Sequence, residues 1–167
     1  MTKLFSFPHP VNETSARLVA AGVVILATTF ALTGNPFVLA ALTFGFVARV
    51  LCGPTFSPLA RFVTQVITPR LNVKHRFVSG PPKRFAQGIG AAFTLGATVL
   101  ALADATTAAR IVIALLAIAA FLEAAFAICL GCIVFGRLMR LSVIPQSVCE
   151  ECNNFNARQL TTQTNRA

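Results

Sequence analysis

Of the 167 residues, 56% are hydrophobic and only 11% are charged, whereas about a quarter of the residues in a soluble domain are charged. This excess of apolar surface excludes an ordinary soluble domain and requires lipid around the chain. The net charge of +9 does not indicate nucleic-acid binding, because Lys and Arg lie between hydrophobic runs and Tyr and Trp are absent.

The amino-terminal part predicts a hairpin of two membrane-spanning helices, over residues 16–33 and 37–53, after a cytoplasmic tail over residues 1–15. Gly34 and its neighbours favour a tight turn between the two helices. Pro54 is expected to stop the second helix, because proline lacks the backbone N–H that a helix needs.

Residues 54–84 form the connection to the next hydrophobic run and contain apolar residues at helical spacing. These residues are Phe56, Leu59, Phe62, Val63, Val66 and Ile67. The spacing predicts an amphipathic helix, which lies flat on the membrane or covers the cytoplasmic end of the helices.

Two further runs, over residues 85–103 and 111–136, predict the second hairpin, and residues 137–167 form a polar tail. Each run is long enough for a hydrocarbon core of about 30 Å at 1.5 Å per residue. The expected fold is therefore an all-α membrane domain over residues 16–136 with four transmembrane helices.

Basic residues determine the expected orientation, because short loops rich in Lys and Arg remain in the cytoplasm. Twelve of them lie before or at the start of the first helix, connect the second and third, or follow the fourth; only Arg110 lies on the opposite side, and Arg49 lies within a span. Both termini are therefore expected in the cytoplasm.

The five cysteines are expected at the cytoplasmic face, where thiols stay reduced. They are Cys52, Cys129, Cys132, Cys149 and Cys152. The last four form two CxxC pairs, which are candidates for thiol redox chemistry or a sulfane-sulfur relay. Their spacing also permits a structural zinc site on a membrane scaffold.

The surroundings of the two pairs predict thiols that are not unusually acidic. Cys129 and Cys132 are expected in the last turns of the fourth helix, at the negative end of its dipole. Glu150 and Glu151 lie within the second pair. The sequence therefore favours a reductant or sulfur acceptor over a strong oxidant.

Two charged residues, Arg49 and Glu123, lie within the predicted spans. Such charges are costly in lipid and are usually paired or functional. They predict an Arg49–Glu123 ion pair, or alternatively the polar site of a small transporter.

Three segments resemble the domain-of-unknown-function 4395 family of bacterial membrane proteins, over about residues 8–154. They are Pro10-Val-Asn-Glu-Thr-Ser-Ala-Arg17, Gly80-Pro-Pro-Lys-Arg-Phe-Ala-Gln-Gly-Ile-Gly90 and the Cys129-Leu-Gly-Cys132 motif. The resemblance implies a multi-pass protein of the bacterial plasma membrane. It also implies a cytoplasmic thioredoxin-like or sulfurtransferase partner, which favours sulfur chemistry at the cysteines.

Overall fold

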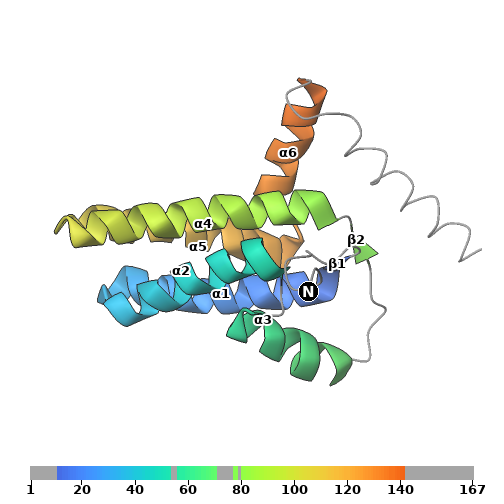
Figure 1. Ribbon diagram of the computed structural model, residues 1–167, viewed down its shortest axis with the longest axis horizontal. Helices are drawn as coiled ribbons and strands as arrows, with labels where there is room; N and C mark the ends of the chain where they lie inside the picture. Colours follow the sequence, from blue (N-terminus) through green and yellow to red (C-terminus); the bar gives the residue numbers. More distant parts are fainter. Residues whose placement is uncertain (1–10, 54–55, 71–76, 79, 142–167) are drawn as a thin grey trace, which may run out of the picture.

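The computed structural model describes residues 11–53, 56–70, 77–78 and 80–141, and these residues are mostly helical. Four long helices run antiparallel in a bundle (Figure 1): α1 (Glu13–Thr33), α2 (Pro36–Cys52), α4 (Gly80–Leu102) and α5 (Thr106–Phe126). Helices α1 and α4 each pack against both α2 and α5. The all-α class predicted from the sequence is confirmed.

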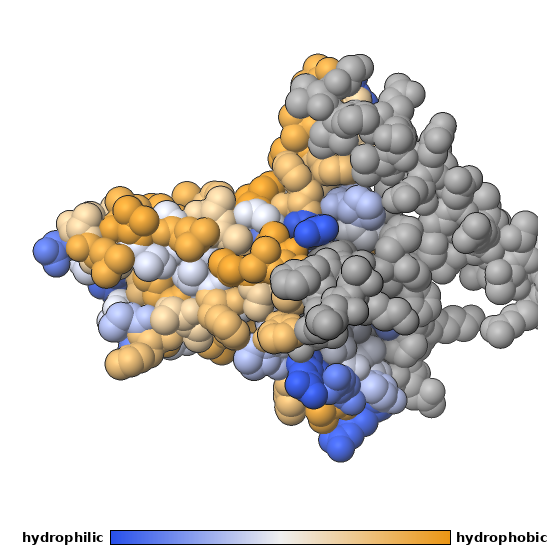
Figure 2. Space-filling model, viewed as in Figure 1, coloured by the Kyte–Doolittle hydropathy of each residue, from blue (hydrophilic) through white to orange (hydrophobic). Residues whose placement is uncertain are grey.

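The outer surface of the bundle is apolar. Helices α1, α4 and α5 are long and apolar enough to cross a membrane, and α2 is a shorter apolar helix of 17 residues. Large side chains are exposed on all four, including Ile25, Phe37, Val99 and Ile118, and Figure 2 shows that hydrophobic residues predominate on the visible face of the bundle. Such a surface needs lipid, as expected for a multi-pass membrane protein.

The bundle core lies along the contacts between the four helices and includes Val23, Phe30, Leu42, Phe46, Ala97 and Ile113. Phe46 of α2 lies directly against Gly90 of α4, where an added Cβ would be only 2.1 Å from the Phe46 ring. The missing side chain at Gly90 therefore lets α2 and α4 approach closely.

Helices α1 and α2 begin and end within a few residues of the first two predicted spans. Asn12 caps α1 by accepting a hydrogen bond from Thr14 N–H at 3.0 Å. Gly34 ends the helix with a left-handed φ of 69°, a conformation that glycine adopts without the Cβ penalty. Asn35 then caps α2, accepting from Phe37 N–H at 2.9 Å.

Two arginines join α1 and α5 at opposite ends of the bundle. Arg17, in α1, donates to the carbonyl oxygens of Ala124 and Ala125 at the end of α5, at 3.0 and 2.9 Å. Arg110, in α5, donates to the carbonyl oxygens of Ala31, at 2.7 Å, and Leu32, at the end of α1. Each helix thus supplies a cation that donates to carbonyl oxygens at the end of the other helix. A positive charge there also interacts favourably with the negative end of the helix dipole.

The connection after α2 is helical, as its spacing predicts. It consists of α3 (Pro58–Phe62), a π-helical turn (Val63–Ile67) and a 3₁₀ turn (Thr68–Arg70). Ala60 and Val63 pack against Val19 of α1, and Ser15 and Thr68 share a hydroxyl hydrogen bond of 2.9 Å. The segment therefore covers α1, in agreement with the second of the two alternatives.

A short antiparallel pairing, which the sequence did not predict, lies at the same end of the bundle. Strand β1 (Val11–Asn12) pairs with β2 (Phe77–Val78), with Val11 opposite Val78. It joins the chain just before α1 to the chain just before α4.

The predicted boundaries of the second hairpin are wrong at both ends. Helix α4 begins at Gly80, five residues before the predicted start, because prolines are well tolerated in the first turn of a helix. Lys83 therefore belongs to the helix, not to the loop. The predicted fourth helix over 111–136 is two helices: α5 ends at Phe126, and α6 (Leu130–Arg140) projects sideways from the bundle (Figure 1).

Candidate functional site

The chain turns sharply between α5 and α6. Ala127 has a left-handed φ of 57°, its N–H donates to the carbonyl of Glu123 at 3.1 Å, and Ile128 N–H donates to the carbonyl of Leu122 at 3.2 Å. Together with the Arg17 bonds to Ala124 and Ala125, these contacts satisfy the carbonyl groups that the helix end leaves unpaired.

A left-handed conformation is unusual for alanine and costs on the order of 1 kcal/mol. Strained backbone of this kind occurs preferentially at functional sites, where the surrounding structure holds it in place. The first cysteine pair begins two residues after Ala127.

Cys129 and Cys132 lie at the start of α6. Cys129 is the N-cap residue, and its Sγ accepts a hydrogen bond from the N–H of Cys132 at 3.3 Å. The thiol of Cys132 also donates to Cys129 Sγ, with the two sulfur atoms 2.6 Å apart and not in a disulfide. The predicted location in the last turns of a helix is therefore wrong, since the pair occupies the positive end of a helix dipole.

In this arrangement the two thiols differ in acidity. The hydrogen bond from the Cys132 thiol lowers the pKa of Cys129, with further help from nearby Lys83 and the Cys132 N–H, against the effects of burial and Glu123. Donating that hydrogen bond, and burial, raise the pKa of Cys132. Cys129 is therefore the more acidic thiol of the pair.

An ion pair lies beside the cysteines. Lys83, in the first turn of α4, bonds to Oε1 of Glu123, in the last turn of α5. Their side chains are only 11% and 16% exposed. Both charges act on Cys129, Lys83 favouring its thiolate and Glu123 opposing it, and their effects add to the larger one of the Cys132 hydrogen bond.

The predicted ion pair between Arg49 and Glu123 is replaced by this contact. Arg49 donates to Gln87 Oε1 at 2.8 Å and Ser57 Oγ at 3.4 Å, and its guanidinium lies 4.4 Å from the centre of the Phe46 ring. The buried cation is held by amide, hydroxyl and aromatic groups, which together lower the cost of placing it among apolar helices.

Helix α6 is held against α4 by a close contact. A Cβ added to Gly131 would lie 2.6 Å from Cα and Cβ of Ala86, so the two backbones approach as only a glycine allows. Phe135 packs against Phe85, with ring centroids 5.5 Å apart and the ring planes tilted by 57°. These contacts fix the position of the cysteine pair relative to Lys83.

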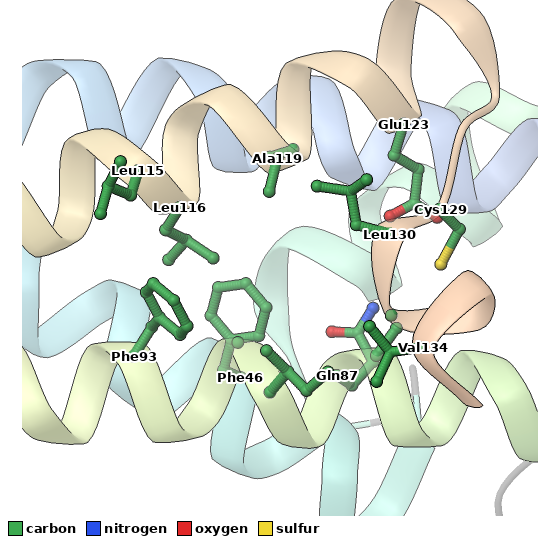
Figure 3. A pocket seen from close by; sticks show the side chains of 15 residues that line it. Phe46, Gln87, Phe93, Leu115, Leu116, Ala119, Glu123, Cys129, Leu130 and Val134 are labelled. Atoms are coloured by element: carbon green, nitrogen blue, oxygen red, sulfur yellow. The ribbon is translucent and has the colours of Figure 1, made fainter. Parts of the chain in front are cut away.

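Cys129 lines two cavities. The outer cavity, of about 480 Å³, also borders Glu13, Pro82, Lys83 and Cys132. The inner cavity, of about 270 Å³, lies between α6 and the bundle and reaches from Cys129 and Glu123 to Phe46, Phe93 and Leu116 (Figure 3). The same residue, Cys129, thus belongs to the walls of both cavities.

The remaining predicted site residues are not brought into this cluster. Cys149 and Cys152 lie outside the described residues, and Cys52 ends α2 and is partly buried. Within residues 11–141, apart from the short segments that are not described, no three His, Cys, Asp or Glu side chains are placed to hold a metal ion. Sequence reasoning missed Lys83, which it assigned to the loop.

The apolar helices and the site at one end of them define a helical, multi-pass membrane protein. Residues 11–140 match the family described as Domain of unknown function (DUF4395), and the chain belongs to that family. The match begins at β1 and ends with α6, and it contains the first cysteine pair and Lys83. No curated protein and no solved structure matches the sequence.

Proposed function

We propose that the protein carries out thiol redox or sulfur-transfer chemistry at Cys129 and Cys132. The observation that supports this function is the position of the pair at the N-terminus of α6, with the Cys132 thiol donating to Cys129 Sγ. A CxxC pair at a helix N-terminus has one acidic thiol that attacks and a second thiol that resolves the product.

The exchange takes place through the outer cavity, where both cysteines are accessible from one side. The Cys129 thiolate attacks a disulfide of a soluble partner, forms a mixed disulfide and releases one partner thiol. Cys132 then attacks Cys129, which releases the second partner thiol and leaves a Cys129–Cys132 disulfide. In a second exchange, the reduced Cys149 and Cys152 pass electrons from a cytoplasmic thioredoxin-like or sulfurtransferase protein to the Cys129–Cys132 disulfide, which restores both thiols and leaves a Cys149–Cys152 disulfide for that protein to reduce.

The alternative of a zinc site with all four cysteines needs Cys129 and Cys132 to point at one ion. Their mutual hydrogen bond favours a redox pair instead. A transport site made of Arg49 and Glu123 is less favoured still, because these residues line different cavities.

For the orientation, we propose that α1, α2, α4 and α5 all cross the bacterial plasma membrane and that the cysteine pair faces the cytoplasm. The support is the excess of Lys and Arg at the end of the bundle that carries α6. Reporter fusions after Asn35 and Asp104 should then be extracytoplasmic, and a fusion after Val78 should be cytoplasmic. A cytoplasmic signal at Asp104 would contradict four crossings.

A redox titration tests the proposed chemistry. In a variant with Cys52→Ser, Cys149→Ser and Cys152→Ser, equilibrated in vesicles with dithiol buffers, both remaining thiols should disappear together. The two-electron couple requires a change of about 30 mV for each tenfold change in the oxidised-to-reduced ratio.

Metal analysis of the unaltered protein is the control. Stoichiometric zinc in the purified protein, with thiols that react only after chelation, would replace the redox function with the structural metal site.

A further inference from the structure

The inner cavity is not used by exchange with a soluble partner, yet Cys129 forms part of its wall. The cavity lies in the corner between α6 and the bundle, and residues of α2, α4, α5 and α6 line it. Figure 3 shows the side chains that project into it from these helices.

The two ends of the inner cavity differ in chemistry. At one end, Phe46, Phe93 and Leu116 provide aromatic and aliphatic surface, and at the other end lie Gln87, Glu123 and Cys129 (Figure 3). A few polar groups at one end of an apolar pocket are typical of a site that orients a small, mostly apolar ligand.

The cavity is bordered by side chains on the lipid-facing side of the bundle. Leu115, Leu130 and Val134 are 54%, 43% and 45% exposed, and all three line it. A ligand dissolved in the bilayer can therefore reach the cavity without crossing water. At about 270 Å³, the space suits one substituted ring, with any long tail left in the lipid, rather than a whole drug-sized ligand, which takes roughly 300 Å³ or more.

We propose that the inner cavity binds the head group of a lipid-soluble quinone, which accepts electrons from Cys129 and Cys132. The inference rests on the proposed dithiol chemistry and adds a second electron acceptor, in the lipid, that takes the place of the partner disulfide. The two thiols lose two electrons and two protons and form one S–S bond. The quinone gains both electrons and both protons and becomes a hydroquinone, which leaves through the lipid-facing opening.

Gln87 is the group that positions the ring. Its Oε1 accepts a hydrogen bond from Arg49 at 2.8 Å, which fixes the plane of the amide and leaves its nitrogen as a donor for a quinone carbonyl oxygen. The buried Arg49 thus acts through Gln87 as a positioning residue, and Phe46, which lies under the guanidinium, forms part of the apolar wall.

The experiment uses the reduced full chain in phospholipid vesicles with decyl-benzoquinone as the probe. Hydroquinone should form with a loss of two thiols for each quinone reduced. Ala119→Phe, which fills the inner cavity, should slow the reaction about tenfold or more. The matched control is Ile118→Phe, the adjacent α5 position, which is 58% exposed and does not line the cavity. Its rate should stay within about twofold of the parent.

Oxidation of the same proteins by a water-soluble disulfide separates this proposal from the dithiol function. If the thiols react with the disulfide but not with the quinone, or if both Phe variants reduce quinone equally fast, the quinone site is wrong and the dithiol function stands. If neither oxidant acts, both fail. Should Ala119→Phe not fold, photolabelling of the unaltered chain with an azidoquinone decides: labelled α4, α5 or α6 peptides at the cavity support the site, and their absence overturns it.

Discussion

Replacing Lys83 with Gln should raise the pKa of Cys129, and replacing Glu123 with Gln should lower it. The cation favours the Cys129 thiolate and the carboxylate opposes it, so each substitution removes a contribution of opposite sign. Each shift should be on the order of one pKa unit, as for other charges within a few ångström of a titrating group. The measurement is the rate of Cys129 alkylation as a function of pH, in a chain where Cys52, Cys149 and Cys152 are Ser.

The matched control is Arg84→Gln, which removes the neighbouring cation of the same helical turn. Arg84 donates to the carbonyl of Val50 and does not contribute to the pKa shift of Cys129, so the profile should not move. Shifts in the same direction for Lys83→Gln and Glu123→Gln would show that altered folding, not charge, controls the thiol.

Cys132→Ser should trap a mixed disulfide on Cys129. The serine hydroxyl keeps a donor near Cys129 Sγ but cannot attack the mixed disulfide, so the first step proceeds and the second stops. In the chain whose Cys52, Cys149 and Cys152 are Ser, mass spectrometry after treatment with glutathione disulfide should find about one glutathione on each Cys132→Ser chain and an internal disulfide when Cys132 is present.

The reciprocal variant, Cys129→Ser, removes the more acidic thiol and leaves Cys132, whose pKa burial still raises. Its reaction with the same disulfide should be slower by about tenfold or more, because only the thiolate is a strong nucleophile. An adduct that forms on Cys132 as quickly as on Cys129 would reverse the assigned roles of the two cysteines.

Much of the fold follows from local sequence signals. The Asn12 cap, the Gly34 turn and the proline at the start of α2 each determine a helix boundary through a local backbone requirement, which the sequence displays directly. The hydrophobic runs also predicted the apolar outer surface, because it depends on composition and not on the pairing of helices.

The site depends on two features that carry no such signal. The break at Ala127 has neither Gly nor Pro, and it forms because Arg17, more than a hundred residues away, and local N–H groups satisfy the end of α5. Length gave one indication: a helix over 111–136 would span about 39 Å at 1.5 Å per residue, more than the roughly 30 Å of a hydrocarbon core.

Lys83 was missed because a cation next to the hydrophobic run over 85–103 was assigned to the loop. With α4 starting at Gly80, that cation enters the bundle, pairs with Glu123 and leaves Arg49 to Gln87 and Ser57. The CxxC spacing identified the reactive pair, but its acidity depends on which helix end it occupies. Which helix end the pair occupies depends on the break between α5 and α6 at Ala127.

The pH dependence of Cys129 alkylation in the chain that retains only Cys129 and Cys132 tests the central claim most directly. A thiol in the last turns of a helix should titrate at or above the ordinary pKa of cysteine. Cys129 as the N-cap of α6, accepting from Cys132, should have a pKa below the ordinary one, and its alkylation rate should reach half its maximum at a correspondingly lower pH than that of an unstructured cysteine peptide measured alongside. A midpoint at or above that of the peptide would contradict the thiolate role of Cys129 and the chemistry proposed from it.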